Sequence, residues 1–180
     1  MKTCIGLLRG INVGGRTSLP MKELVTLLEA LGLEDVRTYV QSGNVVFRHD
    51  RRDLDRLATR ISAAIEKQRG FAPPMLLIDV DGLEQTVRDN PFPEAVEEPK
   101  ALHANFLFRE PPAPDLTALE RLKRNTERFV LGNRVLYLHA PEGIARSKLV
   151  AGAEKALGVP MTGRNWRTVT KLLEMAKGAP

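Results

Sequence analysis

The sequence predicts an α+β fold made of two tandem units, each with the element order βαββαβ. Apolar runs of strand length alternate with longer stretches that carry an apolar stripe at helical spacing, and this order occurs twice along the chain. Two short sequence patterns also recur at similar places in both halves. The order βαββαβ gives an antiparallel sheet with both helices on one face, so the predicted class is two ferredoxin-like subdomains from an internal duplication.

In the first half, predicted as the subdomain 1–93, strands are expected at 3–8, 36–41, 44–48 and 75–80. An amphipathic helix with Ser18 or Leu19 near its N-cap and Pro20 in its first turn ends at Gly32, and a second one ends at Gly70. Asp50 is the predicted N-cap of the second helix. Asp81, with Glu84 three residues on, is predicted to cap a short third helix.

A stretch rich in Pro and Glu, residues 94–102, is predicted as a linker, and residues 103–180 form the second subdomain. Strands are expected at 103–108, 128–131 and 134–139, with a short extended piece at 159–161. Asp115 and Ser147 are the predicted N-caps of the two helices between them, and a last helix carries Trp166.

The duplication is predicted from two echoes. Gly43-Asn44 and Gly132-Asn133 each separate two strand-like runs, where glycine permits the positive φ of a tight hairpin. Pro74-Met75 and Pro160-Met161 each follow a helix that ends in glycine. If the halves are copies, Gly43 and Gly132 should occupy equivalent positions.

Charge is unevenly distributed. The formal net charge is +5, with 13 Lys+Arg against 12 Asp+Glu in residues 1–93 and 14 against 10 in the rest. A basic C-terminal half weakly favours anionic partners, and the alternative is a solvated basic surface. The lone Cys4 excludes an internal disulfide and a cysteine-based zinc site. No apolar run reaches the length of a membrane span and no signal peptide is evident, so we expect a cytoplasmic location, no membrane association and no cofactor.

Several motifs resemble a bacterial family of unknown function. The N-terminal blocks are LLRGINVGG, which starts at Leu7, and YVQSGNVVF, which starts at Tyr39. The block PEGIARSKL from Pro141 and the block RNWRTV from Arg164 resemble later parts of the same family, with Gly163 where threonine is expected. The resemblance implies the two-subdomain α+β fold and no established activity.

The first candidate site is the segment Arg9–Arg16, which joins a strand to a helix. Its glycines allow backbone N–H groups to approach a ligand, and a helix N-terminus follows, which is a common way to bind phosphate or carboxylate. It lacks the Gly-Lys-Ser/Thr of a P-loop. The alternative is a tight turn with solvated arginines. Candidate ligand-binding residues at this end of the unit are Arg9, Asn12, Gly14, Gly15, Arg16, Gln41 and Asn44.

Two further candidates lie in the second half. Arg146 and Lys148 flank Ser147 at a helix start, where positive charge opposes the helix dipole and so suggests an anionic partner. The alternative is an ordinary capped helix with a basic first turn. Arg164 and Asn165 precede Trp166, with Asn165 as a helix N-cap and Trp166 in the core as the alternative. The three histidines are scattered, and no nucleophile elbow is present.

Binding of a small anionic molecule, a nucleotide or a phosphorylated metabolite, is therefore the predicted function. A nucleic-acid-associated protein that uses the basic C-terminal half is one alternative. An enzyme with a site of Arg, Asn, Gln and Lys split between the halves is another. The oligomeric state and any catalysis stay open.

Overall fold

A computed structural model describes residues 1–50 and 53–178. The chain divides into two compact units, which we call unit 1 (Met1–Gln85 with Lys171–Pro180) and unit 2 (Thr86–Thr170). This division differs from the predicted one, because the C-terminal segment groups with the first unit. The predicted linker 94–102 overlaps a 3-10 helix, η1 (Pro93–Glu97), and lies within unit 2.

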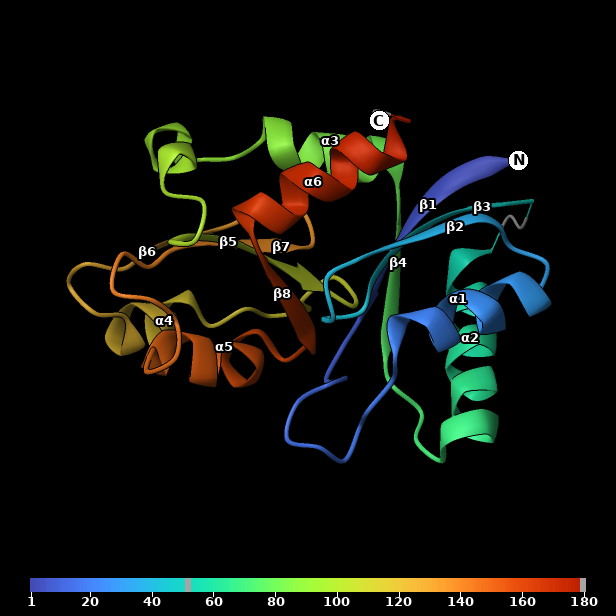
Figure 1. The fold of residues 1–180 in the computed structure, drawn as a ribbon. Coiled ribbons are helices and arrows are strands. Elements are labelled where there is room, and N and C mark those ends of the chain that lie inside the picture. Colours follow the sequence, from blue (N-terminus) through green and yellow to red (C-terminus); the bar gives the residue numbers. More distant parts are fainter. Residues whose placement is uncertain (51–52, 179–180) are drawn as a thin grey trace. The chain divides into compact units, whose positions relative to one another are not determined.

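Unit 1 contains β1 (Lys2–Leu8), α1 (Met21–Ala30), β2 (Glu34–Tyr39), β3 (Asn44–His49), α2 (Leu54–Arg69) and β4 (Met75–Asp79). The strands form an antiparallel sheet in the order β2-β3-β1-β4. Helices α1 and α2 lie against one face of this sheet (Figure 1), and their apolar stripes close a core with residues such as Leu24, Phe47 and Ile61. Helix α3 (Val80–Arg88) follows β4.

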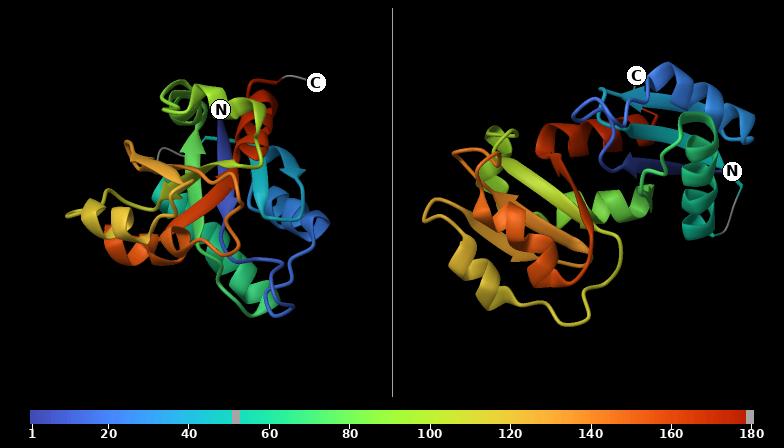
Figure 2. Two further views of the ribbon diagram at one scale, coloured as in Figure 1. Left: turned by 90° about the vertical axis from the view of Figure 1, so that its left-hand side faces the viewer. Right: turned by 90° about the horizontal axis from the view of Figure 1, so that it is seen from below.

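Unit 2 repeats this order with β5 (Leu102–Leu107), α4 (Leu116–Leu122), β6 (Arg128–Leu131), β7 (Val135–His139), α5 (Lys148–Leu157) and β8 (Met161–Asn165). Its antiparallel sheet has the order β6-β7-β5-β8. Helices α4 and α5 lie side by side (Figures 1 and 2) and pack on the sheet through Leu119, Ala153 and Leu157. Helix α6 (Trp166–Ala176) follows β8. The predicted α+β class is confirmed.

The two sheets also share their register. Leu8 pairs with Met75 in unit 1, and Leu107 pairs with Met161 in unit 2. The residue after each of these leucines donates its N–H to a proline carbonyl, Arg9 to Pro74 at 2.9 Å and Phe108 to Pro160 at 3.0 Å. The Pro-Met pairs seen in the sequence therefore occupy the same place in both sheets.

The glycines of the two hairpins, by contrast, do not occupy the same place in the two sheets. The N–H of Leu8 bonds to the carbonyl of Gly43, whereas the N–H of Leu107 bonds to the carbonyl of Arg134. Gly43 has φ 76° and Arg134 has φ 54°, while Gly132 has no positive φ. The prediction that Gly43 and Gly132 occupy equivalent positions is wrong, because Arg134 takes the left-handed position in the second hairpin.

Helix caps are partly as predicted. The side chains of Asp115 and Ser147 accept from the N–H three residues on, at 2.9 and 3.2 Å. The predicted caps Asp50 and Asp81 are wrong. Asp53 caps α2 by accepting from the N–H of Arg56 at 2.9 Å, and Asp79 accepts from the N–H of Gly82 at 2.8 Å at the start of α3.

The C-terminal segment is attached to unit 1 by polar contacts. The Arg37 guanidinium in β2 donates to the carbonyl of Met175 at 2.8 Å, and Lys177 pairs with Glu84 of α3. Within residues 1–50 and 53–178, no helix has the length and apolar character that crossing a lipid bilayer requires.

Candidate functional site

The Arg9–Pro20 loop of unit 1 is fixed by one asparagine. Asn12, at φ 56°, donates its Nδ2 to the carbonyls of Leu19 (3.0 Å) and Gln41 (2.7 Å) and accepts the N–H of Leu19 at 2.8 Å. The hydroxyl of Thr17 donates to the carbonyl of Gly10 at 2.6 Å. The amide of Asn12, a predicted ligand group, is thus engaged within the protein.

The adjoining hairpin is fixed in the same way. Asn44 is fully buried and donates its Nδ2 to the carbonyl of Tyr39 at 3.0 Å and to the Ser42 hydroxyl at 2.9 Å. Gln41 contributes its main-chain carbonyl, which accepts the hydrogen bond from the Asn12 side chain. Gly14, Gly15 and Arg16 lie exposed at the tip, and Arg9 is half-buried.

The start of α1 already has a carboxylate. Pro20 occupies the N-cap and Glu23 lies in the first turn. Arg69, from the end of α2, pairs with Glu23 at 3.1 Å and donates to the carbonyl of Ser18 at 2.9 Å. Because Glu23 meets the positive end of the helix dipole, a bound anion there would face a negative charge.

The two candidate segments of unit 2 are dispersed. Ser147 is buried as a helix cap, while Arg146 and Lys148 are exposed. Arg164 is buried in β8 and donates to the Thr162 hydroxyl and the Gly163 carbonyl, each at 2.8 Å, and burial lowers its pKa to about 10. Asn165, a candidate ligand-binding residue, accepts the N–H of Thr168 at 3.0 Å, which is the capping role given as its alternative.

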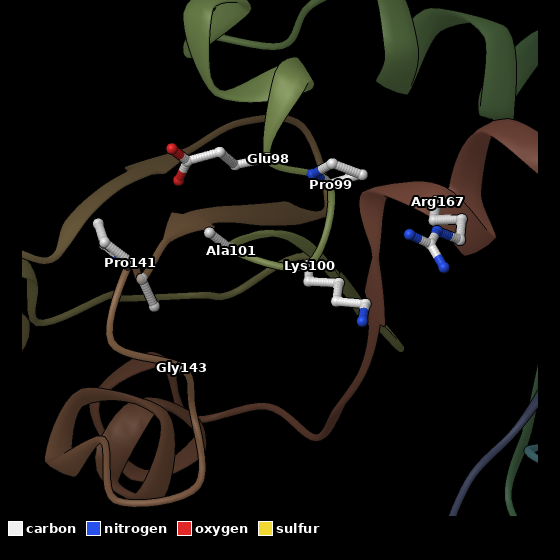
Figure 3. Close-up of a pocket in the computed structure, with 8 residues that line it drawn as sticks. Glu98, Pro99, Lys100, Ala101, Pro141, Gly143 and Arg167 are labelled. Atoms are coloured by element: carbon white, nitrogen blue, oxygen red, sulfur yellow. The ribbon is translucent and has the colours of Figure 1, made fainter.

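A cavity of about 350 Å³, open to solvent and with Lys100 and Arg167 both exposed, nevertheless lies beside both segments. Its walls come from the chain before β5, the chain after β7 and the first turn of α6: Glu98, Pro99, Lys100, Ala101, Ala140, Pro141, Gly143 and Arg167. Figure 3 shows the side chains of Lys100 and Arg167 extending toward the same space, with the Glu98 carboxylate directed away from them. All of these residues belong to unit 2.

Backbone hydrogen bonds hold these walls together. The N–H of Ala140 donates to the carbonyl of Ala101 at 2.8 Å, and the N–H of Trp166 donates to the carbonyl of Pro99 at 3.0 Å. The two cations are therefore carried on segments whose spacing is set by main-chain bonds.

A side-chain cluster lies just outside the cavity walls. Arg128 pairs with Glu94 at 2.5 Å, lies 3.0 Å from Nδ1 of His139 and stacks over the ring of Phe92 at 4.7 Å from its centroid. Its guanidinium holds the pKa of Glu94 below the usual range. Glu94 precedes one wall of the cavity and His139 directly precedes Ala140 of the other, so Arg128 connects the two.

Two cationic side chains, Lys100 and Arg167, line this cavity. Among the described residues, the side chains of Lys100 and Arg167 form no ion pair or hydrogen bond. The lining contains no serine, cysteine or histidine, and no group of acidic, cysteine or histidine side chains in residues 1–50 and 53–178 is placed to hold a metal ion. The lining does contain the Glu98 carboxylate, a type of group that can act as a general base.

Sequence reasoning missed Lys100 and Arg167. Lys100 lies in the stretch predicted as a linker, and Arg167 follows Trp166 within a motif whose preceding residues were selected instead. The signal that was available is the absence of an acidic residue from the first turn of α6, where Arg167 lies.

Comparison with known proteins identifies a family. A conserved bacterial protein from Streptococcus pneumoniae, of known structure, is 25% identical, covers 98% of this chain and 99% of its own, and has a TM-score of 0.68. A search of curated proteins returned no match. The sequence profile of the family described as protein of unknown function (DUF1697) matches residues 1–137. The chain therefore belongs to the DUF1697 family, whose function is unknown.

Proposed function

We propose that this protein binds a small anion in the cavity of unit 2, where Lys100 and Arg167 attract it. The observation that carries the proposal is that two cations on the walls of one cavity of about 350 Å³ have no side-chain partner in the part of the chain that the structure describes. Two like charges on neighbouring segments repel each other, and an anion between them would replace that repulsion with attraction.

The start of α6 adds to this attraction. An α-helix has a partial positive charge at its N-terminus, and the first turn of α6 contains Arg167 and no acidic residue. The first turn of α1, by contrast, contains Glu23 in an ion pair with Arg69. The positive end of α6 is therefore the better place for an external anion.

Thermal unfolding in the presence of inorganic phosphate tests the proposal. A ligand at a hundredfold excess over its dissociation constant stabilises the folded state by about 2.7 kcal/mol. For a chain of this length that corresponds to a rise in Tm of roughly 5–10 °C. The double variant Lys100→Ala/Arg167→Ala should lose the rise, and Arg121→Ala, which removes an exposed cation elsewhere in unit 2, should keep it.

The Arg9–Arg16 segment is the competing location for the same function. Its exposed glycines and Arg16 support it, while the internal hydrogen bonds of Asn12 favour a structural role. The variant Arg9→Ala/Arg16→Ala separates the two. A phosphate response that survives in Lys100→Ala/Arg167→Ala but disappears in Arg9→Ala/Arg16→Ala would move the site to unit 1 and refute the cavity.

We also infer that the two units are ferredoxin-like repeats produced by duplication. The support is their shared strand order and the pairing of Cys4 with Asp79 and of His103 with Asn165 at the same step of the register. Asp79 and Asn165 each accept an N–H at the start of the following helix. An experimental structure in which 2–79 and 101–165 fail to superpose in this register would end the inference.

A further inference from the structure

We propose that the anion in this cavity is a compact organic one, in which a single phosphate or carboxylate group is attached to a small apolar body. The inference rests on the proposed function and concerns the class of ligand. It follows from the unequal chemistry of the walls, which are cationic at one place and apolar at another.

The cationic side suits one charged group. Lys100 contributes a flexible ammonium, and Arg167 contributes a planar fork of N–H donors that matches two oxygens of a phosphate or carboxylate. Two positive charges balance one or two negative charges. A nucleoside triphosphate, with roughly four negative charges at neutral pH, would leave most of its charge unmatched here.

The apolar side is made of small residues. Pro99, Ala101, Ala140 and Pro141 supply half of the lining, and the half-buried Pro99 and the exposed Pro141 present apolar surface that a ligand could cover. Small-molecule sites have volumes from roughly 300 Å³ upward, so a cavity of about 350 Å³ suits a ligand larger than a bare ion but smaller than a dinucleotide. An apolar body would displace water from this wall, which an inorganic ion leaves hydrated.

The lining also argues against a nucleic acid. Single strands bind to proteins through aromatic side chains on which bases stack, and none of the eight lining residues is aromatic. The Glu98 carboxylate at the margin, directed away from the two cations in Figure 3, would repel a polyanion that extended past the cavity.

Matched ligands of equal charge test this class. Isothermal titration at pH 7.5 and constant ionic strength would compare inorganic phosphate with phenyl phosphate and acetate with benzoate, alongside ATP and a single-stranded oligonucleotide. A body that buries roughly 60 Å² of apolar surface corresponds to about tenfold in affinity. We expect the member with the ring to bind about tenfold more tightly in each pair, and ATP and the oligonucleotide to bind more weakly than phenyl phosphate.

Two double variants separate the parts of the site. Pro99→Ala/Pro141→Ala removes apolar surface while keeping the Pro99 carbonyl that holds Trp166, so it should lower the preference for phenyl phosphate over phosphate about threefold. Lys100→Ala/Arg167→Ala should weaken both ligands, and circular dichroism would confirm that each variant is folded.

The outcomes distinguish the inference from the function on which it rests. Equal affinities within each pair would overturn the organic class and leave anion binding intact. Tighter binding of ATP or the oligonucleotide would overturn it as well. If no anion binds at all, both the ligand class and the proposed anion-binding function are refuted.

Discussion

Units 1 and 2 have the same strand order but differ in how their connections are fixed. In unit 1 the Asn12 side chain forms hydrogen bonds with the loop after β1 and with the hairpin between β2 and β3. The buried Asn44 side chain donates a hydrogen bond across the same hairpin, to the carbonyl of Tyr39. In unit 2 main-chain bonds position the segments around a cavity, and Lys100 and Arg167 have no side-chain partner within residues 1–50 and 53–178. Glycines and arginines in a loop therefore do not by themselves indicate a ligand site, since the relevant property is whether the polar groups have partners within the protein.

The largest expected contrast is between the two hairpin glycines. At Gly43, with φ 76°, an added Cβ would lie 2.6 Å from Cβ of Leu8 and 2.8 Å from Cδ1 of Ile11. We expect Gly43→Ala to lower the free energy of unfolding by about 3 kcal/mol, from backbone strain and overpacking together.

Gly132→Ala is the matched control in unit 2. Its added Cβ would lie 2.9 Å from Cε2 of the Tyr137 ring and 3.6 Å from the carbonyl oxygen of Val135, and its backbone has no positive φ. A loss below about 1 kcal/mol in urea denaturation is expected. Similar losses at both glycines would contradict the assignment of Arg134, and not Gly132, as the counterpart of Gly43.

Asn12 should give the next largest effect. Asn12→Ala removes three hydrogen bonds and places alanine at φ 56°, so we expect a loss of about 2–3 kcal/mol in the free energy of unfolding. Asn12→Asp keeps the acceptor for the Leu19 N–H and should lose less. If Asn12 instead served mainly as a ligand, Asn12→Ala would leave stability unchanged and abolish the Tm response to phosphate.

Much of the fold could be predicted because its signals are local. Apolar spacing located the strands and helices, and Gly70 and Gly158 were identified as helix ends, where both adopt the left-handed conformation. The caps Asp50 and Asp81 were misassigned because a second aspartate lies near the start of each helix, and only the position of the first helical N–H selects one. Of the two repeated sequence patterns, the Pro-Met pairs mark equivalent positions in the two sheets, and the Gly-Asn pairs do not.

The cavity could not be predicted for a different reason. Lys100, Pro141 and Arg167 are far apart in sequence and meet only because β5 pairs with both β7 and β8. No sequence motif with a fixed spacing relates these three residues. The basic C-terminal half was visible in the composition, but composition does not tell an open cavity from a solvated surface.

The variant Arg128→Ala tests whether the spacing of the cavity walls depends on side-chain contacts as well as on main-chain hydrogen bonds. Because Arg128 is half exposed, its ion pair and ring contact should contribute less than about 1 kcal/mol each, so Arg128→Ala should remain folded. We expect phosphate affinity to fall about threefold through displacement of the walls, with Arg128→Lys intermediate. Unchanged affinity in Arg128→Ala would assign the spacing of the walls to the main chain alone.

The smallest expected effect concerns two equivalent buried positions. Cys4 in β1 and His103 in β5 stand at the same step of the register, and burial raises the pKa of the Cys4 thiol to about 12 while it lowers the pKa of His103 below its usual range. Cys4 therefore stays neutral across the ordinary pH range. His103 also stays neutral in the folded protein at a pH where the unfolded chain binds a proton. Stability from His103 is thus present above the usual histidine pKa of about 6.5 and is lost as the pH falls below it.

The variant His103→Cys places the unit 1 residue in unit 2. Urea denaturation from pH 8 to pH 5 should show a smaller loss of stability for the variant than for the natural chain, while Cys4→Val should leave the pH dependence as it was. Parallel pH profiles for His103→Cys and the natural chain would mean that His103 takes up its proton equally in both states, and the contrast between the two positions would then be one of packing alone.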